Sequence, residues 1–230
     1  MKKVLSIDYD YFQNVSLDIL KGVYPDGIDL PTDISNAIWK AKYKSDEICS
    51  VLNGVTLISN ELALAEKILA SQQTDTVALV ASSHESIYDF IHDNFSEREK
   101  LLVVNADMHH DFFNDQSEMF VDCGNWLGHI HKEWGKNFYW KWIMNPVTNE
   151  MYGLTKGTDK FPVTVSLNEI QDMKFDAVFL CRSDPWTPPH LDYGFEHLLD
   201  IMTEHFDNIE IEEAVRCSRL CMPQMKGLKT

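Results

Sequence analysis

The sequence is poor in basic residues. Lysine and arginine together number 20, against 36 aspartates and glutamates, and the formal net charge is -16 at neutral pH. Proteins that follow phosphate backbones need clustered Lys and Arg, so we expect no nucleic-acid partner. Long apolar runs are also missing, because only a few apolar residues separate Met1-Lys2-Lys3 from Asp8. A signal peptide or membrane span needs a longer run, so we expect neither export nor a membrane partner.

Paired cysteines are missing too. The five cysteines are odd in number and form no CxxC motif, so the sequence predicts neither a disulfide framework nor a zinc knuckle, and a reducing cytoplasm fits it. With 230 residues, 44% of them hydrophobic, the chain can bury one full core but is short for two ordinary domains. We therefore expect a single domain over residues 1–230. The sequence does not determine its oligomeric state.

Short apolar runs alternate with stretches of helical period, a pattern typical of βα units around a mostly parallel sheet. The predicted strands are almost wholly apolar, as strands covered by helices on both faces are; they span residues 3–7, 76–81, 101–105 and 177–181. Helices are predicted over 58–70, 84–95 and 193–206, and loops rich in Gly, Pro or polar residues over 14–31 and 145–162. The predicted fold class is α/β, a three-layer α/β/α domain.

Three of the predicted strands end in residue types that bind metals. The segments are Ser6-Ile7-Asp8-Tyr9-Asp10, Ser82-Ser83-His84-Glu85-Ser86 and Asp107-Met108-His109-His110-Asp111. Ligand sites of open α/β sheets lie at the carboxyl ends of the strands, and residues two apart in an extended segment share a face. The predicted metal ligands are therefore Asp8, Asp10, His84, Asp107, His109 and Asp111.

Four carboxylates in one place repel each other unless cations neutralise them. A mixed oxygen and nitrogen set without thiolates suits Mn(II), and two cations balance the charge better than one. Taken alone, Asp8 and Asp10 could be loop carboxylates and His84 a helix cap. The DxHxD triplet that begins at Asp107 has no comparable packing or turn explanation, so it carries the metal prediction.

The same three segments resemble the motifs of the arginase and agmatinase superfamily, the ureohydrolases, namely SxDxD, a GGDHS-like histidine segment and DAHxD. In that family SxDxD comes last, whereas here it opens the chain, so the resemblance implies an arginase/deacetylase-like fold with a circularly permuted strand order. Serines replace the glycines before His84, Met108 replaces a small residue, and no DP follows Asp10. A fourth segment, 122–128, is similar to the SGNxHG motif that lines the substrate cleft, and it makes Asn125 a candidate substrate-binding residue.

Within the superfamily, the chain looks most like the divergent peptide arginases. Conventional arginases hold the α-carboxylate of free arginine with residues whose counterparts here are Phe113 and Cys123. The resemblance thus implies an arginine-containing precursor peptide as partner, two Mn(II) ions as cofactors, and conversion of peptidyl arginine to ornithine with release of urea. It further implies that Asp107 and Asp8 bridge the cations, that His84 and Asp111 complete one site and His109 and Asp10 the other, and that water acidified there attacks the guanidinium carbon.

The resemblance leaves the proton donor open. Leu127 occupies the place of the histidine of SGNxHG, so the candidates are His129 and, beside it, His131.

A guanidinium substrate also needs a carboxylate that pairs with its planar fork, and Asp184 after the fourth predicted strand is our candidate. Asp184 could equally start a turn before Pro185. Trp186 or Trp126 could pack on the substrate, although tryptophans more often pack in the core.

Three other functions stay open at this point. A haloacid-dehalogenase-like phosphatase would use Asp8 and Asp10 after the first strand, but it leaves the DxHxD triplet unexplained. A metal-dependent deacetylase on the same superfold would use one zinc and fewer carboxylates. A protein that only binds a peptide, with structural metals, is the non-catalytic alternative.

Overall fold

The computed structural model describes residues 1–25, 29–112, 120–153 and 165–216. Its main sheet has six parallel strands in the order β6-β5-β1-β7-β4-β8. The strands are β1 (Lys2–Asp8), β4 (Val77–Ala81), β5 (Leu101–Asp107), β6 (Phe138–Met144), β7 (Ala177–Cys181) and β8 (Asn208–Ile211). The four predicted strands are confirmed as β1, β4, β5 and β7, which form the centre of the sheet.

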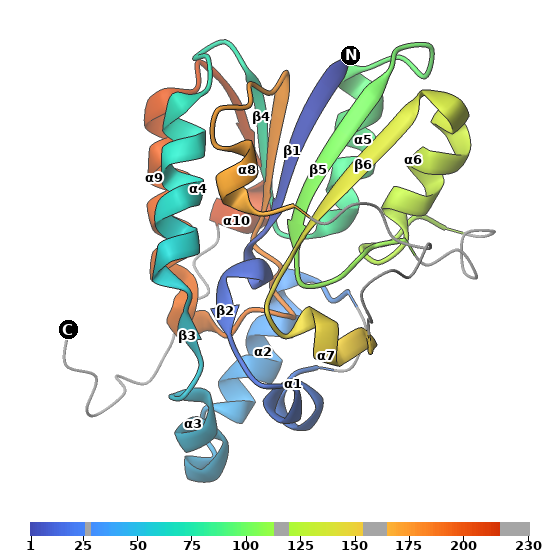
Figure 1. Ribbon diagram of the computed structural model, residues 1–230. Coiled ribbons are helices and arrows are strands. Elements are labelled where there is room, and N and C mark those ends of the chain that lie inside the picture. The colour runs from blue at the N-terminus through green and yellow to red at the C-terminus, as the bar shows by residue number, and fades with distance from the viewer. Residues whose placement is uncertain (26–28, 113–119, 154–164, 217–230) are drawn as a thin grey trace.

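Helices cover both faces of this sheet, as Figure 1 shows. One face carries α4 (Ser59–Ser71), α8 (Leu167–Ile170) and α9 (Asp192–His205), and the other carries α5 (Ile87–Asn94) and α6 (Trp126–Trp134). The strands alternate between the two cores: Leu5 and Ile7 of β1 pack with α4 and α9, whereas Val4 packs with α5 and α6. The predicted three-layer α/β/α class is confirmed, and the three predicted helices correspond to α4, α5 and α9.

A further group of elements lies beyond the carboxyl ends of the strands (Figure 1). It consists of α1 (Leu17–Val23), α2 (Thr32–Lys42), α3 (Asp46–Leu52), α7 (Thr148–Tyr152) and the antiparallel pair β2 (Gln13–Asn14) and β3 (Thr56–Leu57). Short segments complete the described chain: the 3₁₀ turns η1 (Tyr9–Phe12), η2 (His84–Ser86), η4 (Gly135–Asn137) and η5 (Pro189–Leu191), and α10 (Glu213–Arg216). This group surrounds the edge of the sheet where the metal-ligand motifs lie.

Two predicted loops contain helices, so the loop prediction is wrong there. Helix α1 lies within 14–31 and begins after Ser16, whose hydroxyl accepts a hydrogen bond from Ile19 N at 3.4 Å and so caps the helix. Helix α7 lies within 145–162, where Asn145 Oδ1 accepts from Val147 N at 2.8 Å just before the helix. Residues 26–28 and 154–162 of these loops lie outside the described residues.

The longest helix of the described residues, α9, has 14 residues. No helix in the described ranges combines the length and apolar character that a membrane span requires.

Candidate metal centre

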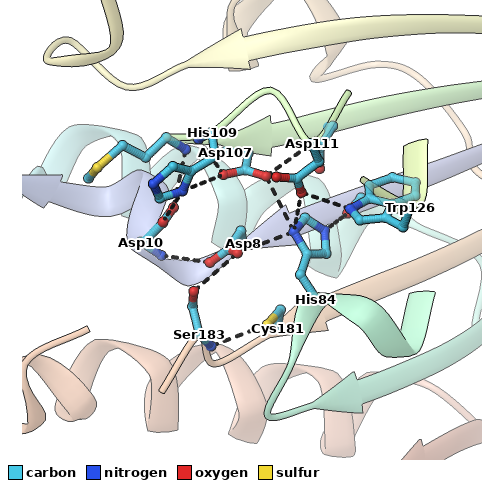
Figure 2. Close-up of polar contacts among 12 residues, drawn as sticks. Asp8, Asp10, His84, Asp107, His109, Asp111, Trp126, Cys181 and Ser183 are labelled. Atoms are coloured by element: carbon cyan, nitrogen blue, oxygen red, sulfur yellow. Dashed lines mark hydrogen bonds and ion pairs between the residues drawn. The ribbon is translucent and has the colours of Figure 1, made fainter. Parts of the chain in front are cut away.

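The six predicted ligands come together at the carboxyl ends of the central strands (Figure 2). We call Asp8, Asp10, His84, Asp107, His109 and Asp111 the Asp/His cluster. Strands β1 and β5 are neighbours, with Ile7 opposite Ala106, so their tips supply the aspartates side by side. His84 enters from η2, directly after β4. Five of the six residues are almost fully buried, and His109 is half-buried.

Three carboxylates surround one nitrogen of His84. Its Nδ1 lies 2.9 Å from Asp111 Oδ2, 3.2 Å from Asp8 Oδ2 and 3.3 Å from Asp107 Oδ2. These lengths are those of ion pairs, yet none of the three contacts has hydrogen-bond geometry, and the nitrogen has no hydrogen-bond partner among the described residues. The nitrogen and the three oxygens thus point at a common space (Figure 2).

His109 lies in a second group of the same kind. Its Nδ1 is 2.9 Å from Asp10 Oδ2 and 3.7 Å from Asp107 Oδ1. Asp107 therefore turns one carboxylate oxygen toward each histidine. Two sets of potential ligands fall within 4.8 Å, Asp8 with His84 and Asp107, and Asp10 with Asp107 and His109. Asp107 is common to both sets, which is the position of a bridging ligand.

The donor set fits divalent cations better than it fits an empty polar core. Asp10 Oδ2 and His84 Nδ1, one in each ligand set, are buried and lack hydrogen-bond partners in the described part of the chain, a costly state unless a cation lies beside each of them. Burial, together with the charge of Asp8, raises the pKa of Asp10 to about 7. Burial acts to lower the pKa of His84, but Asp111, Asp107 and Asp8 raise it well above its ordinary value. Without metal, protons must therefore supply the missing positive charge.

Hydrogen bonds from behind hold the cluster in place. His84 Nε2 lies 2.8 Å from Ser6 Oγ, which leaves Nδ1 to face the carboxylates. Asn105 Nδ2 donates to Asp107 Oδ2 at 3.0 Å, and Trp126 Nε1 donates to Asp111 Oδ2 at 2.7 Å. Such outer contacts fix the orientation of metal ligands. Ser6 and Asn105 were not predicted from the sequence, although each lies two residues before a predicted ligand on the same strand face.

Two residues at this edge have a left-handed backbone. Asp111 has φ of 48° and Ser183 has φ of 56°, and both are non-glycine residues. Ser183 Oγ donates to Asp8 Oδ2 at 3.2 Å. Residues in this region cost free energy and persist where the surroundings hold them, commonly at functional sites. Asp111, in this conformation, has its Oδ2 2.9 Å from His84 Nδ1.

Asp184 does not have the free carboxylate that the sequence analysis assigned to it. Arg182 Nε donates to Asp184 Oδ1 at 2.5 Å, and Arg182 Nη2 donates to Oδ2 at 2.9 Å. Thr32 Oγ1 adds a bond to Oδ2 at 2.6 Å. The guanidinium that pairs with Asp184 is therefore that of Arg182, two residues earlier in the chain. The hydrogen bond from Thr32 joins this segment after β7 to the start of α2. This geometry argues against Asp184 as the guanidinium-binding residue and favours a structural role.

Both polar atoms of the Asn125 side-chain amide are also hydrogen-bonded, in this case to the backbone. Its Oδ1 accepts from Asp122 N at 2.8 Å and its Nδ2 donates to Phe120 O at 3.0 Å. The side chain, only 1% exposed, therefore holds the loop that precedes α6. This arrangement argues against a direct contact between Asn125 and a substrate.

The histidines proposed as proton donors lie on α6 and pack against aromatic rings. The ring of His129 lies 6.1 Å from that of Tyr88 on α5, and the ring of His131 lies 5.3 Å from that of Phe112. No contact among the described residues joins either histidine to the Asp/His cluster, so their role stays a prediction. Trp186, by contrast, lies at the cluster, with its ring 4.8 Å from that of His109.

Comparison with known proteins identifies no relative: a scan against known protein families, a search of curated proteins and a search of solved structures each found no match. The resemblance to ureohydrolases therefore stays a prediction.

Proposed function

We propose that the chain is a dinuclear-metal hydrolase of the arginase type, which converts arginine residues of a peptide to ornithine and releases urea. One observation carries the proposal. Asp107, fully buried, turns Oδ1 toward His109 and Oδ2 toward His84, and so joins two potential ligand sets into one cluster. A single-metal deacetylase has no need of the second set, and a phosphatase that uses Asp8 and Asp10 has no need of the histidines.

Charge balance supports two cations, for which Mn(II) is our proposal. The four carboxylates of the Asp/His cluster are buried, and two divalent cations with two neutral histidines would leave it formally neutral. Two such ions, when bound, supply Lewis acidity and lower the pKa of water that they hold. The chain's own residues would provide the ligands, with Asp107 and Asp8 shared, while Ser6 and Trp126 keep His84 and Asp111 in position.

The surroundings of the cluster favour arginine within a peptide over the free amino acid. Cys123 follows Asp122 in the loop before α6, and burial, assisted by Asp29 and Asp111, raises the pKa of its thiol. A neutral thiol among carboxylates offers no cationic anchor for an α-carboxylate and leaves that group repelled. A peptidyl arginine carries no charged α-carboxylate. Phe113, the other substituted anchor position, lies outside the described residues.

The proposal extends to the cellular location. Within the described residues, the thiols of Cys123 and Cys181 form no disulfide, which is consistent with a reducing cytoplasm.

The test uses the Mn(II)-loaded protein and benzoyl-Gly-Gly-Arg-Gly-Gly-amide. Release of urea would lower the peptide mass by about 42 Da, the difference between arginine and ornithine, and a colorimetric assay would detect the urea. Free arginine, an acetyl-lysine peptide and p-nitrophenyl phosphate serve as parallel substrates. Urea from the arginine peptide supports the proposal. Acetate release alone would favour a deacetylase, phosphate release alone a phosphatase, and no turnover of any substrate would favour a binding protein.

A further inference from the structure

The segment 29–32, which leads into α2, lies beside the candidate metal centre. It is attached at two points three residues apart. Asp29 Oδ2 accepts a hydrogen bond from Ser83 Oγ, after β4, and Thr32 Oγ1 donates to Asp184 Oδ2 at 2.6 Å, after β7. Because β4 and β7 are neighbouring strands, the segment 29–32 crosses their carboxyl ends beside the Asp/His cluster.

Ser83 fixes the place of the Asp29 carboxylate. The serine hydroxyl accepts a hydrogen bond from Glu85 N at 3.1 Å, as the cap of η2. Its single proton is then directed to Asp29. Since Ser83 directly precedes His84 in the chain, the carboxylate of Asp29 is held next to a predicted ligand but belongs to neither ligand set.

Asp29 and Asp184 differ in how much of their hydrogen-bonding capacity is used. Both oxygens of Asp184 are engaged by Arg182, and one also by Thr32. For Asp29, the bond from Ser83 to Oδ2 is the one hydrogen bond that its side chain makes within the described ranges. A carboxylate can accept two parallel hydrogen bonds from a guanidinium. Asp29 can still accept such bonds, whereas both oxygens of Asp184 already accept them from Arg182.

The charges around Asp29 call for a cation. Burial raises the pKa of this carboxyl, the carboxylates of Asp8 and Asp184 raise it further, and Ser83 and His84 act in the opposite direction. The Asp29 carboxyl is thus within electrostatic reach of the cluster. A positively charged group bound beside Asp29 would relieve the repulsion between these carboxylates, and this relief would strengthen its binding.

We propose that Asp29 is the residue that selects a cationic substrate, by pairing with the guanidinium of an arginine side chain, and that Ser83 is its positioning residue. This inference rests on the proposed function, since it names the recognition group of that same site. In this proposal Asp29 binds the guanidinium, the role that the sequence alone assigns to Asp184.

The experiment compares two peptides that differ in charge at one position. Benzoyl-Gly-Gly-Arg-Gly-Gly-amide and its citrulline counterpart, nearly equal in shape but neutral, are titrated into the Mn(II)-loaded protein by calorimetry. The variants are Asp29→Asn, Ser83→Ala and, as a matched control, Asp33→Asn, an exposed carboxylate four residues away at the start of α2. Metal content is measured for every variant.

We expect the unaltered protein to bind the arginine peptide more tightly than the citrulline peptide, by roughly 10- to 100-fold for a charge-assisted pair. Asp29→Asn should abolish the preference, Ser83→Ala should reduce it, and Asp33→Asn should keep it, all with unchanged metal content. Equal binding of both peptides by the unaltered protein, a preference that survives in Asp29→Asn, or loss of metal from that variant would overturn the inference. Urea release by the unaltered protein would then still support the proposed function, whereas a charge preference without urea release would refute the function alone.

Discussion

Two buried tryptophans of α6 allow a test of whether Asp111 is a metal ligand, because only one of them is hydrogen-bonded to that residue. Trp126 and Trp134 are both almost fully buried, and each ring packs about equally close to a histidine, at 5.1 Å from His84 and 5.0 Å from His92. They differ in one respect. Trp126 Nε1 donates to Asp111 Oδ2 at 2.7 Å, whereas Trp134 Nε1 has no hydrogen-bond partner among the described residues.

Replacement of each tryptophan by phenylalanine therefore separates the hydrogen bond from the packing. Both variants lose similar buried ring area, but only Trp126→Phe removes a donor from a predicted ligand. A hydrogen bond to a charged group contributes about 1.5–3 kcal/mol, which corresponds to roughly 10- to 150-fold in an equilibrium constant. Loss of an outer partner of a metal ligand typically weakens metal binding about 10- to 100-fold. The two ranges agree, and we expect a loss within them.

The assay is a calorimetric titration of Mn(II) into metal-free protein at constant pH. Trp126→Phe should weaken the site that contains Asp111, while Trp134→Phe should bind Mn(II) like the unaltered protein and differ only in thermal stability. If both variants bind with unchanged affinity, or if both lose affinity equally, Asp111 does not act as a ligand oriented by Trp126 and the reasoning fails.

Two further predictions concern protons and packing. Burial acts to lower the pKa values of His84 and His109, but the surrounding carboxylates raise both well above the ordinary range. Because cations must displace these protons, Mn(II) affinity should rise between about pH 6 and pH 8, by about tenfold per pH unit for each proton displaced. An Mn(II) affinity that calorimetry shows to be independent of pH would contradict this prediction. Gly194→Ala should lower stability by about 1–3 kcal/mol, because its Cβ would lie 2.5 Å from Tyr9 Oη. Gly22→Ala, with nothing within 4 Å of the new Cβ, is the control in urea unfolding, and equal losses would refute the steric argument.

The centre of the fold could be predicted because its strands are buried on both faces. Strands β1, β4, β5 and β7 lie inside the sheet, and each contains a run of buried apolar residues that stands out in the sequence. The edge strands escape this rule. In β8, Ile209 and Ile211 pack into the core while Asn208 and Glu210 do not. In β6, Tyr139 is 45% exposed. Four or seven residues of such mixed character resemble ordinary loop sequence.

The Asp/His cluster could be predicted for a related reason. Parallel strands place their carboxyl ends at one edge of the sheet, so ligand-type residues that follow different strands meet in space. Residues whose role depends on contacts across the fold could not be assigned in this way. In the sequence, Asp184 and Asp29 are both aspartates outside the predicted strands and helices. Only the folded structure shows that Asp184 is the one paired with Arg182.

Metal content tests the central claim most directly. The protein is stripped with chelator, reloaded with Mn(II), dialysed and analysed by plasma mass spectrometry, alongside Asp107→Asn, which changes the carboxylate common to both ligand sets. We predict two equivalents of Mn(II) per chain for the unaltered protein and loss of both in the variant. A protein that retains no metal or a single equivalent, or a variant that still retains two, would contradict a dinuclear centre bridged by Asp107.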